Sequence, residues 1–387
     1  MPDAKPNRTH LWILAMLMAL GLFARVVWIS RVDTQAVTDF AWYLSKGQEI
    51  AKGLGYQDRG SATAYWPVGW PAALGLMFQI SPATLAGAKI LTTFLTLLAV
   101  PLTYWLGRGL FHREEPSLLA AGIISLHPHF IAYSSILASE PLFTCLTLGF
   151  FICQVEAVKK PLHAGLSGLL LGLACFVRPQ AVLLPFLIRL FSWRRDGLDR
   201  ILAWISVGLC LVACLGVLSP WLLHTKAVFG RIVFVSTNGG DNLLIGHHPG
   251  ATGRYKNPDE CGLVRPPDMK EGERDQAALR QALDNIRQDP LQSLRLIPAK
   301  LTETLFTTTD AAYWAFQLDP KGLQPAGITD PVFYKQFRAV SQWAQWSLLG
   351  MALLGLLRLA LARRCSSLPI LASGLALPLI LSAVFFG

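Results

Sequence analysis

The chain has 387 residues, of which 53% are apolar and only 15% are charged, and its mean hydropathy is +0.43. A soluble core of this size needs fewer apolar side chains, so the composition excludes an ordinary soluble protein and predicts an integral membrane protein. The net charge is +10. Its Arg and Lys residues gather between apolar runs, which excludes a nucleic-acid footprint and predicts contact with the anionic head groups of a lipid bilayer.

Apolar runs of roughly spanning length follow one another along the chain. A bilayer core needs a helix of about 20 residues, and the runs that approach this length are 11–30, 84–107, 117–135, 140–157, 163–177, 179–193, 201–223, 342–358 and 367–386. The first run is too long for a signal-peptide core and lacks a small-residue cleavage site before Arg31, so we interpret it as a retained anchor. The prediction is an all-α integral membrane protein with about nine transmembrane helices.

Basic residues orient these helices. If the N-terminus is cytoplasmic, alternate crossings bring the following to the cytoplasmic side: Arg108, Arg113, Lys159, Lys160, Arg194, Arg195, Arg200, Arg358, Arg363 and Arg364. This is the positive-inside pattern. Between Lys226 and Val340 there are 14 Lys and Arg against 13 Asp and Glu. We therefore expect a transmembrane catalytic domain at 1–225, an extracytoplasmic, mostly helical domain at 226–341, and C-terminal transmembrane helices at 342–387.

The first external loop, 31–83, holds the first candidate catalytic acid. Thr38 or Asp39 is a good N-cap, and apolar residues then recur at helical spacing from Phe40 to Leu54, which predicts an interfacial helix. Asp39 therefore serves either as a helix cap or as a general base. Asp33 is a second acid six residues earlier, and the sequence alone does not choose between the two as base.

Two further charged residues lie at predicted turns on the same external face. Glu140 precedes Pro141 at the start of a crossing, where it is either a favourable N-terminal helix charge or a functional acid. Arg178 is a lone positive charge on this side. It either snorkels to the interface or binds a phosphate of a lipid carrier, because a guanidinium pairs bidentately with phosphate oxygens.

Aromatic and histidine residues on this face have a structural and a functional interpretation. Tyr65 and Trp66 are typical of an interfacial aromatic belt, which we favour over stacking on a sugar or prenyl chain. His127 and His129 are more typical of interfacial histidines than of a metal site, since two histidines make an incomplete ligand set.

Five short motifs follow one another along the chain: Asp39 followed by Trp42-Tyr43, the Ser139-Glu140-Pro-Leu-Phe turn, the Arg178-Pro turn, Pro220-Trp-Leu-Leu-His-Thr, and Ser236-Thr-Asn-Gly-Gly-Asp. In this order they resemble the motifs of polytopic C-type glycosyltransferases related to protein O-mannosyltransferases and to the transferase that adds aminoarabinose to lipid A. This chain has His224-Thr225 where relatives often carry Arg-Asn. Relatives also continue beyond an apolar run such as the one ending at Gly387, so we expect a truncated chain or an incomplete donor site.

The resemblance implies an inverting transferase of the bacterial inner membrane, with its N-terminus in the cytoplasm and its active site outside. It would use a polyprenyl-phosphate-linked sugar donor and an envelope lipid, glycan or protein as acceptor. It implies Asp39 as catalytic base, Glu140 as a second acid and Arg178 near the donor phosphate. We also assign substrate contacts to Tyr43, Tyr65, Trp66, His129, Asn238 and Asp241. No cofactor is required by this scheme, and a divalent metal stays open.

Two other functions remain as alternatives. Many crossings with Glu140 and Arg178 at their boundaries are compatible with a transporter or flippase, although we find no repeated halves and no clear ionisable residue in the middle of the spans. The third possibility is a non-catalytic scaffold protein.

Overall fold

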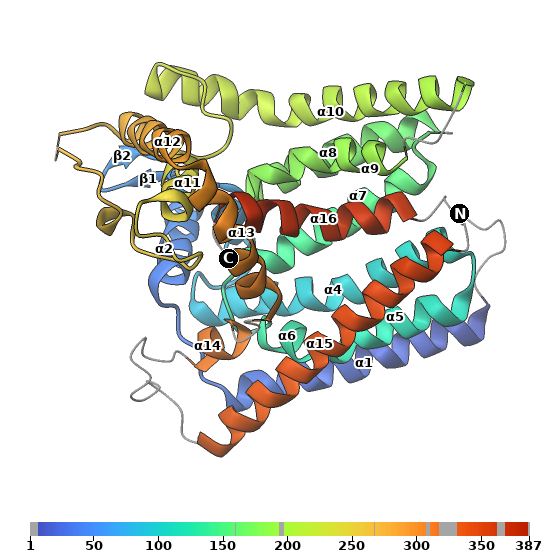
Figure 1. The fold of residues 1–387 in the computed structure, drawn as a ribbon. Helices are drawn as coiled ribbons and strands as arrows, with labels where there is room; N and C mark the ends of the chain where they lie inside the picture. Colours follow the sequence, from blue (N-terminus) through green and yellow to red (C-terminus); the bar gives the residue numbers. More distant parts are fainter. Residues whose placement is uncertain are drawn as a thin grey trace.

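A bundle of long apolar helices, with shorter polar helices at one end, makes up the protein (Figure 1). The computed structural model describes residues 7–158, 160–192, 197–266, 268–306, 310–316, 331–361 and 368–385. The helices of the bundle are α1 (Arg8–Arg31), α4 (Leu85–Phe111), α5 (Glu114–Leu126), α7 (Glu140–Glu156), α8 (Pro161–Val177), α9 (Leu184–Phe191), α10 (Gly197–Phe229), α15 (Pro331–Leu361) and α16 (Leu368–Val384).

The remaining elements are short and lie between the bundle helices. They are α2 (Thr38–Ala51), α3 (Gly69–Met77), α6 (Pro128–Ala132), α11 (Gly239–His247), α12 (Glu271–Gln288), α13 (Pro290–Phe306), α14 (Asp310–Phe316), the 3-10 helices η1 (Pro179–Leu183) and η2 (Pro258–Glu260), and the strands β1 (Gln57–Asp58) and β2 (Ser61–Ala62). Figure 1 shows α2, α11, α12 and the two strands together at one end of the bundle, which we call the capped end.

The predicted multi-pass, helical membrane fold is confirmed. Within the described residues, four helices are long and apolar enough to cross a membrane, namely Arg8–Arg31, Leu85–Phe111, Leu198–Phe229 and Val332–Leu361. Shorter apolar helices cover Pro161–Val177, Pro179–Phe191 and Leu368–Val384.

One predicted spanning helix is interrupted. The run 117–135 is not a single helix, because α5 ends at Leu126 and α6 begins at Pro128, with His127 between them in an extended conformation (ψ 127°). A proline disfavours the helical conformation in the residue before it, so the helix breaks there.

The start of α1 and the ends of α4, α7 and α9 lie at the end of the bundle opposite to the capped end (Figure 1). We call this the basic end, because the described basic residues near it include Arg108, Arg113, Lys160, Arg200 and Arg358. The arrangement agrees with the alternation of crossings that the basic residues predicted.

A buried arginine ties three helices of the bundle together. Arg25 of α1 is fully buried and donates four hydrogen bonds, to the hydroxyl and carbonyl of Thr96 on α4 (3.0 and 3.2 Å) and to the carbonyls of Gly21 and Ser125 (2.9 Å each). A charge inside a bundle is tolerated only when it is satisfied in this way. The expectation that no clear ionisable residue lies inside the spans is therefore wrong, although this one is bound by structural acceptors.

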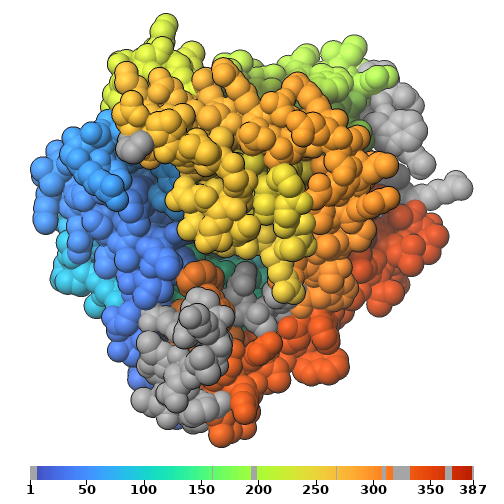
Figure 2. Space-filling view, turned by 60° about the vertical axis from the view of Figure 1, so that its left-hand side comes forward, coloured from blue at the N-terminus to red at the C-terminus, as the bar shows by residue number. Residues whose placement is uncertain are grey.

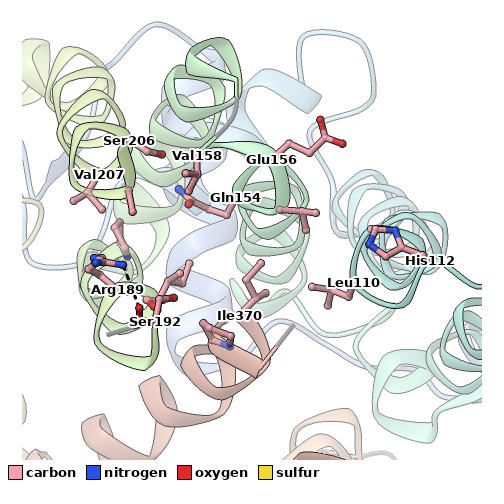
Figure 3. Close-up of a pocket in the computed structure, with 16 residues that line it drawn as sticks. Leu110, His112, Gln154, Glu156, Val158, Arg189, Ser192, Ser206, Val207 and Ile370 are labelled. Carbon is pink, nitrogen blue, oxygen red and sulfur yellow. Dashed lines mark hydrogen bonds between the residues drawn. The ribbon is translucent and has the colours of Figure 1, made fainter. Parts of the chain in front are cut away.

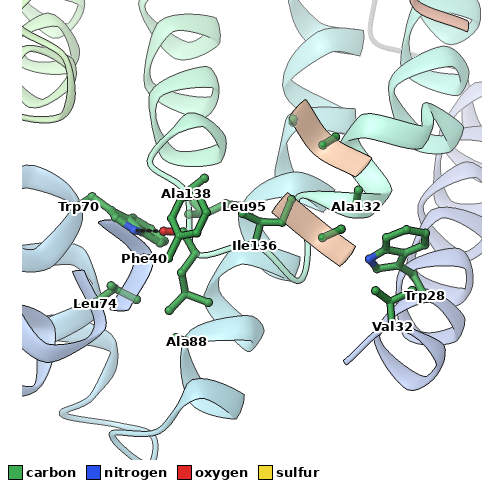
Figure 4. Packing of buried hydrophobic residues seen from close by; sticks show 14 of the residues in the cluster. Trp28, Val32, Phe40, Trp70, Leu74, Ala88, Leu95, Ala132, Ile136 and Ala138 are labelled. Carbon is green, nitrogen blue, oxygen red and sulfur yellow. Dashed lines mark hydrogen bonds between the residues drawn. The ribbon is translucent and has the colours of Figure 1, made fainter. Parts of the chain in front are cut away.

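A cluster of buried apolar residues fixes the turn that precedes Glu140. Trp28, Phe40, Trp70, Leu95 and Ile136 from α1, α2, α3, α4 and the turn pack together (Figure 4). The indole of Trp70 donates a 2.9 Å hydrogen bond to the carbonyl of Leu137. Burial and this bond hold the backbone just before α7, so the start of α7 is set by the core rather than by the surface.

The first external loop contains a β-hairpin that the sequence analysis missed. Strands β1 and β2 pair in antiparallel fashion, with Gln57 opposite Ala62 and Asp58 opposite Ser61. The connecting residues Arg59 and Gly60 both have positive φ (49° and 80°), as a two-residue type I′ turn requires. Two-residue strands are too short to give an alternating pattern, which is why only helices were expected here.

Candidate active site

Side chains from three separate segments gather at the capped end. Asp39 and Tyr43 come from α2, Glu140 is the first residue of α7, and Arg178 is the residue that ends α8. Arg178 and Glu140 form an ion pair of 2.6 Å. Asp39 is close enough to Glu140 for their charges to interact. The residues that the sequence named as base, second acid and phosphate ligand therefore lie together.

Asp39 is not the helix cap that the sequence allowed. The N-cap of α2 is Val37, which has no side-chain capping bond, and Asp39 is the second residue of the helix. The preceding Thr38 has a φ of 48°, a left-handed conformation that is costly for a β-branched residue. Across the described ranges, no donor makes a hydrogen bond or ion pair with the Asp39 carboxylate. Its oxygens are thus available to a substrate.

The surroundings of Asp39 favour its protonated form. Partial burial raises the pKa of Asp39 above its ordinary value, and the negative charge of Glu140 raises it further. The side chain nevertheless reaches the molecular surface. An exposed carboxyl with a raised pKa suits a group that must accept a proton.

Tyr43 lies one helical turn after Asp39 and within range of all three charged groups. Burial is the main cause that raises the pKa of Tyr43, the charges of Asp39 and Glu140 raise it further, and the charge of Arg178 lowers it. Tyr43 therefore keeps its phenolic proton and can donate it in a hydrogen bond.

The guanidinium of Arg178 is held from several sides. It contacts the Ser139 hydroxyl at 3.5 Å and lies over the ring of Phe143 at 5.9 Å. The attraction of Glu140 is the main cause that raises the pKa of Arg178. Its buried Nε has no hydrogen-bond partner among the described residues. The Nε–H of Arg178 can therefore donate a hydrogen bond to a group that is not among the described residues.

Gly69 places α3 directly against the end of α8. A Cβ at this position would collide with the backbone of Phe176 and Val177, the two residues before Arg178. Only glycine permits this close approach, so Gly69 helps to fix where the guanidinium of Arg178 lies.

The capped end is hollowed between these elements. In Figure 2, α2 and its following loop (blue) and the segment 230–265 (yellow) border a depression, and some teal atoms show at its floor. Tyr255 belongs to the yellow segment. Burial raises the pKa of Tyr255, and the charge of Asp39 raises it further, so the two residues face the same region.

Aromatic side chains form a continuous cluster beside Asp39. The ring centroids of Tyr43 and Trp66 are 6.2 Å apart, and those of Tyr65 and Trp66 are 5.2 Å apart. Trp42 and Tyr56 extend the cluster, and Tyr56 donates a 2.8 Å hydrogen bond to the carbonyl of Trp66. Of the predicted residues, Tyr43 lies within range of the acid group, and Trp66 and Tyr65 are joined to it through ring contacts.

A second group of charged residues, which the sequence analysis mostly missed, ties the capped end together. Glu271 of α12 accepts hydrogen bonds from the hydroxyls of Thr63 and Thr237 (2.6 Å each) and from the amide of Ala64 (2.8 Å). It therefore joins the first external loop to the segment after α10. The N-terminal position of Glu271 in a helix is the one feature of the sequence that marks it, and that position alone is ordinary.

Asp241 belongs to this second group. Its buried carboxylate binds the guanidinium of Arg265 at 2.5 Å and accepts a 2.9 Å hydrogen bond from the hydroxyl of Tyr65. Both oxygens are engaged, which favours a structural role. The substrate role assigned to Asp241 stays a prediction.

The Ser236–Asp241 segment leads into a helix rather than a plain turn. Asn238 is the residue before α11, and its side-chain oxygen accepts a 2.8 Å bond from the hydroxyl of Ser236. Gly240 lies against the backbone of Asp275 on α12, and its amide donates to the Asp275 carboxylate at 2.8 Å. The glycine is needed because a Cβ would collide with α12.

Two other candidates lie apart from Asp39. Asp33 is exposed and lies within electrostatic range of Lys89 on α4. His129 is on α6, which packs mainly against α1, α5, α14 and α15, and its ring lies 5.2 Å from that of His127. In the part of the chain that the structure describes, no three His, Cys, Asp or Glu side chains cluster as metal ligands would.

The comparisons with known proteins concern the fold and the family resemblance. Residues 66–224 match the family described as dolichyl-phosphate-mannose-protein mannosyltransferase. The oligosaccharyltransferase of Archaeoglobus fulgidus, solved in the apo form, superposes with a TM-score of 0.54 over 97% of this chain at 12% identity. The chain has the C-type glycosyltransferase fold.

The resemblance to polytopic glycosyltransferases that the motifs indicated is therefore confirmed. The C-type fold of this chain spans half the length of the archaeal enzyme. A second structure of the archaeal oligosaccharyltransferase AglB, in complex with an inhibitory peptide and a dolichol-phosphate, has a TM-score of 0.47 at 12% identity and covers the same shares of the two chains. No curated protein matches this chain. The family match includes Glu140 and Arg178, whereas Asp39 lies before it.

Proposed function

We propose that this C-type fold is a membrane glycosyltransferase, which moves a sugar from a polyprenyl-phosphate-linked donor to an envelope acceptor with inversion. Asp39 is the general base. One observation carries the proposal: an exposed carboxylate without a described partner lies beside the Glu140–Arg178 ion pair at one end of the bundle. A base beside a held cation is what transfer from a phosphate-linked sugar requires.

In the proposed reaction, the acceptor hydroxyl or amine forms a bond to the anomeric carbon while the bond from that carbon to the phosphate oxygen breaks. The acceptor proton passes to Asp39, and the electron pair of the broken bond goes to the polyprenyl phosphate. Attack from the face opposite to the phosphate inverts the configuration. Because the phosphate is already a good leaving group, no general acid is needed.

Arg178 offsets the charge that develops on the phosphate. Its Nε–H is the donor without a described partner, and its ion pair with Glu140 orients the planar guanidinium. Glu140 has a second effect, because its charge raises the pKa of Asp39 and makes that carboxylate a better proton acceptor.

The aromatic cluster supplies the surface for the sugar or the prenyl chain. Tyr43 lies within range of the acid group and contacts Trp66, which contacts Tyr65. Aromatic rings of this kind bind apolar faces while their polar atoms make hydrogen bonds. Substrate contacts of His129 and Asn238 belong to the same proposal, whereas that of Asp241 stays a prediction, since both of its oxygens are engaged.

We place the protein in a bacterial inner membrane, with the capped end outside the cytoplasm. The support is the concentration of basic residues at the opposite end, which the positive-inside rule assigns to the cytoplasm. The proposed acceptor is an envelope lipid, glycan or protein, and the scheme needs no metal.

Reconstitution tests this function. The protein is placed in liposomes with radiolabelled polyprenyl-phosphate sugars and a mixture of envelope acceptors, and the product is analysed by NMR for its anomeric configuration. We expect labelled product of inverted configuration and an equal amount of released polyprenyl phosphate. Product with retained configuration would contradict the base mechanism, and donors left unconsumed in every mixture would contradict the enzyme itself.

A further inference from the structure

A hydrogen bond between two hydroxyl groups joins the chain segments that lead into the two candidate acids. Thr34 lies five residues before Asp39, and Ser135 lies five residues before Glu140. The oxygens Thr34 Oγ1 and Ser135 Oγ are 2.9 Å apart, although the two residues are 101 positions apart in sequence. The bond therefore ties the segment before the proposed base directly to the segment before the second acid.

The two hydroxyls belong to a buried set of hydrogen bonds. The Thr34 hydroxyl donates to the carbonyl of Ala315 on α14 at 3.0 Å, and the indole of Trp28 on α1 donates to the Ser135 hydroxyl at 3.0 Å. The Ser135 hydroxyl also lies 3.0 Å from the carbonyl of Ala132. Thr34 is 1% exposed and Ser135 is fully buried. Because hydrogen bonds away from water are strong and costly to lose, these contacts hold α1, α14, the first external loop and the turn before α7 together.

Helix α14 holds the chain on both sides of Thr38. One of its carbonyls accepts the bond from Thr34, and its Trp314 ring packs edge-on against Phe40, with the ring centroids 5.1 Å apart. Thr38, between these two contacts, has the left-handed φ of 48°. A strained residue of this kind persists only where the surrounding structure fixes it. The contacts on either side of Thr38 thus set the point at which α2 begins.

The packing around these hydroxyls contrasts with that at the opposite end of the bundle. A cavity of about 400 Å³ lies at the basic end, between α4, α7, α9, α10 and α16 (Figure 3). Among the described residues, none that line this cavity belongs to the first external loop or to the turn before α7. Trp28, Val32, Ala132 and Ile136, by contrast, are buried together in one cluster (Figure 4). Close-packed segments keep a fixed spacing, so a change in one is felt by the other.

We propose that Thr34 is a positioning residue, which holds Asp39 beside Glu140 by joining the two segments that lead into them. The inference rests on the proposed role of Asp39 as general base. Thr34 is buried and acts through the chain, not through contact with the substrate. A misplacement of about 1 Å can lower a rate by about 10²-fold. The same movement would weaken the effect of the Glu140 charge, which raises the pKa of Asp39.

Thr34→Val tests the proposal, because valine resembles threonine in shape but has no hydroxyl. The pKa of Asp39 can be read from the full chain in liposomes without any substrate, by labelling with dicyclohexylcarbodiimide, which reacts with protonated carboxyl groups. Peptide mass spectrometry at a series of pH values then gives the labelled fraction of Asp39. We expect a midpoint above 3.8 in wild type and a midpoint at lower pH in Thr34→Val. Thr34→Ser keeps the hydroxyl and should restore the wild-type midpoint.

Further variants separate positioning from folding. Ser135→Ala removes the other hydroxyl and should lower the midpoint as well. The double variant Thr34→Val/Ser135→Ala should match either single variant, because all three lose the same contact. Thr304→Val is the matched control: the Thr304 hydroxyl donates to the Ser382 hydroxyl at 2.7 Å, between α13 and α16. Its loss should leave the midpoint of Asp39 unchanged.

Transfer assays on the same variants complete the test. We expect Thr34→Val to lower kcat by about 10–100-fold with little change in KM, and Thr34→Ser to recover the rate. The proposal is overturned if Thr34→Val and Ser135→Ala keep the wild-type midpoint, if Thr304→Val shifts it equally, or if Thr34→Val keeps the wild-type kcat. If wild type transfers no sugar, the proposed function fails, whereas the labelling midpoints still decide whether Thr34 positions Asp39.

Discussion

Two groups of carboxylates at the capped end differ in what their oxygens contact. Asp241 accepts hydrogen bonds from Arg265 and Tyr65, and Glu271 accepts them from Thr63, Ala64 and Thr237. Asp39 accepts none from the residues that the structure describes, and its neighbour Glu140 has Arg178 as its principal partner. A satisfied carboxylate holds chain segments together, whereas an unsatisfied one beside a cation can exchange a proton with a substrate. This contrast predicts that substitution of Asp39 lowers activity, whereas the same substitution of Asp241 lowers stability.

The largest effect should come from Asp39→Asn. Removing the general base is expected to lower the transfer rate by about 10²–10⁴-fold, while the melting temperature stays as in wild type because the carboxylate makes no described bond. The measurement is initial rates from a labelled lipid-phosphate sugar together with a thermal unfolding curve. Asp33→Asn is the matched control and should keep full activity. Loss of activity in the control alone would move the base to Asp33.

Asp241→Asn should lower the stability of the protein rather than its transfer rate. Removing one partner of a buried ion pair leaves Arg265 uncompensated, which typically costs about 3–5 kcal/mol of stability. Denaturant unfolding in detergent measures this loss. The double variant Asp241→Asn/Arg265→Met removes both charges and should recover most of the stability. If Asp241→Asn instead folds as wild type and only raises the KM, Asp241 contacts the substrate after all.

Arg178→Gln should reduce transfer by roughly 10²–10³-fold, the range seen when one preorganised donor to a developing anion is lost. Arg178→Lys keeps the charge but not the planar fork, so it should recover part of the rate. Transfer rates measured at saturating acceptor and varied donor concentration compare the two variants. Equal activity of Arg178→Gln and wild type would refute a role beside the phosphate.

The smallest effect concerns the pH dependence. Burial and then Glu140 raise the pKa of Asp39, so the rate should increase with pH through a midpoint above the ordinary value of 3.8 for an aspartate. Glu140→Gln removes the charge of Glu140 but leaves the burial of Asp39. The midpoint of the pH profile should therefore shift to lower pH, but only part of the way to the ordinary value. The pH profile of kcat/KM provides the measurement. An upward movement would show that the two carboxyls do not interact in the way described.

Much of the fold could be predicted because it follows from local patterns. The length of the apolar runs specified spanning helices, and the helical spacing after Asp39 specified α2, which the structure places at Thr38–Ala51. Pro141 and Pro179 marked the turns where Glu140 and Arg178 lie. The β-hairpin and the break at His127 were missed, because strands of two residues and a single proline leave weak patterns.

The sequence by itself therefore determined a multi-pass helical bundle and the acids and arginine at its turns, because hydrophobic length and helix-terminal residues act over a few positions. Only the tertiary structure decided which charges meet. Glu140 pairs with Arg178 across 38 residues and Glu271 binds Thr63 across 208. Arg25 is satisfied inside the bundle by groups on two other helices. Such contacts depend on how helices pack in space, and a single sequence carries no local signal for that packing.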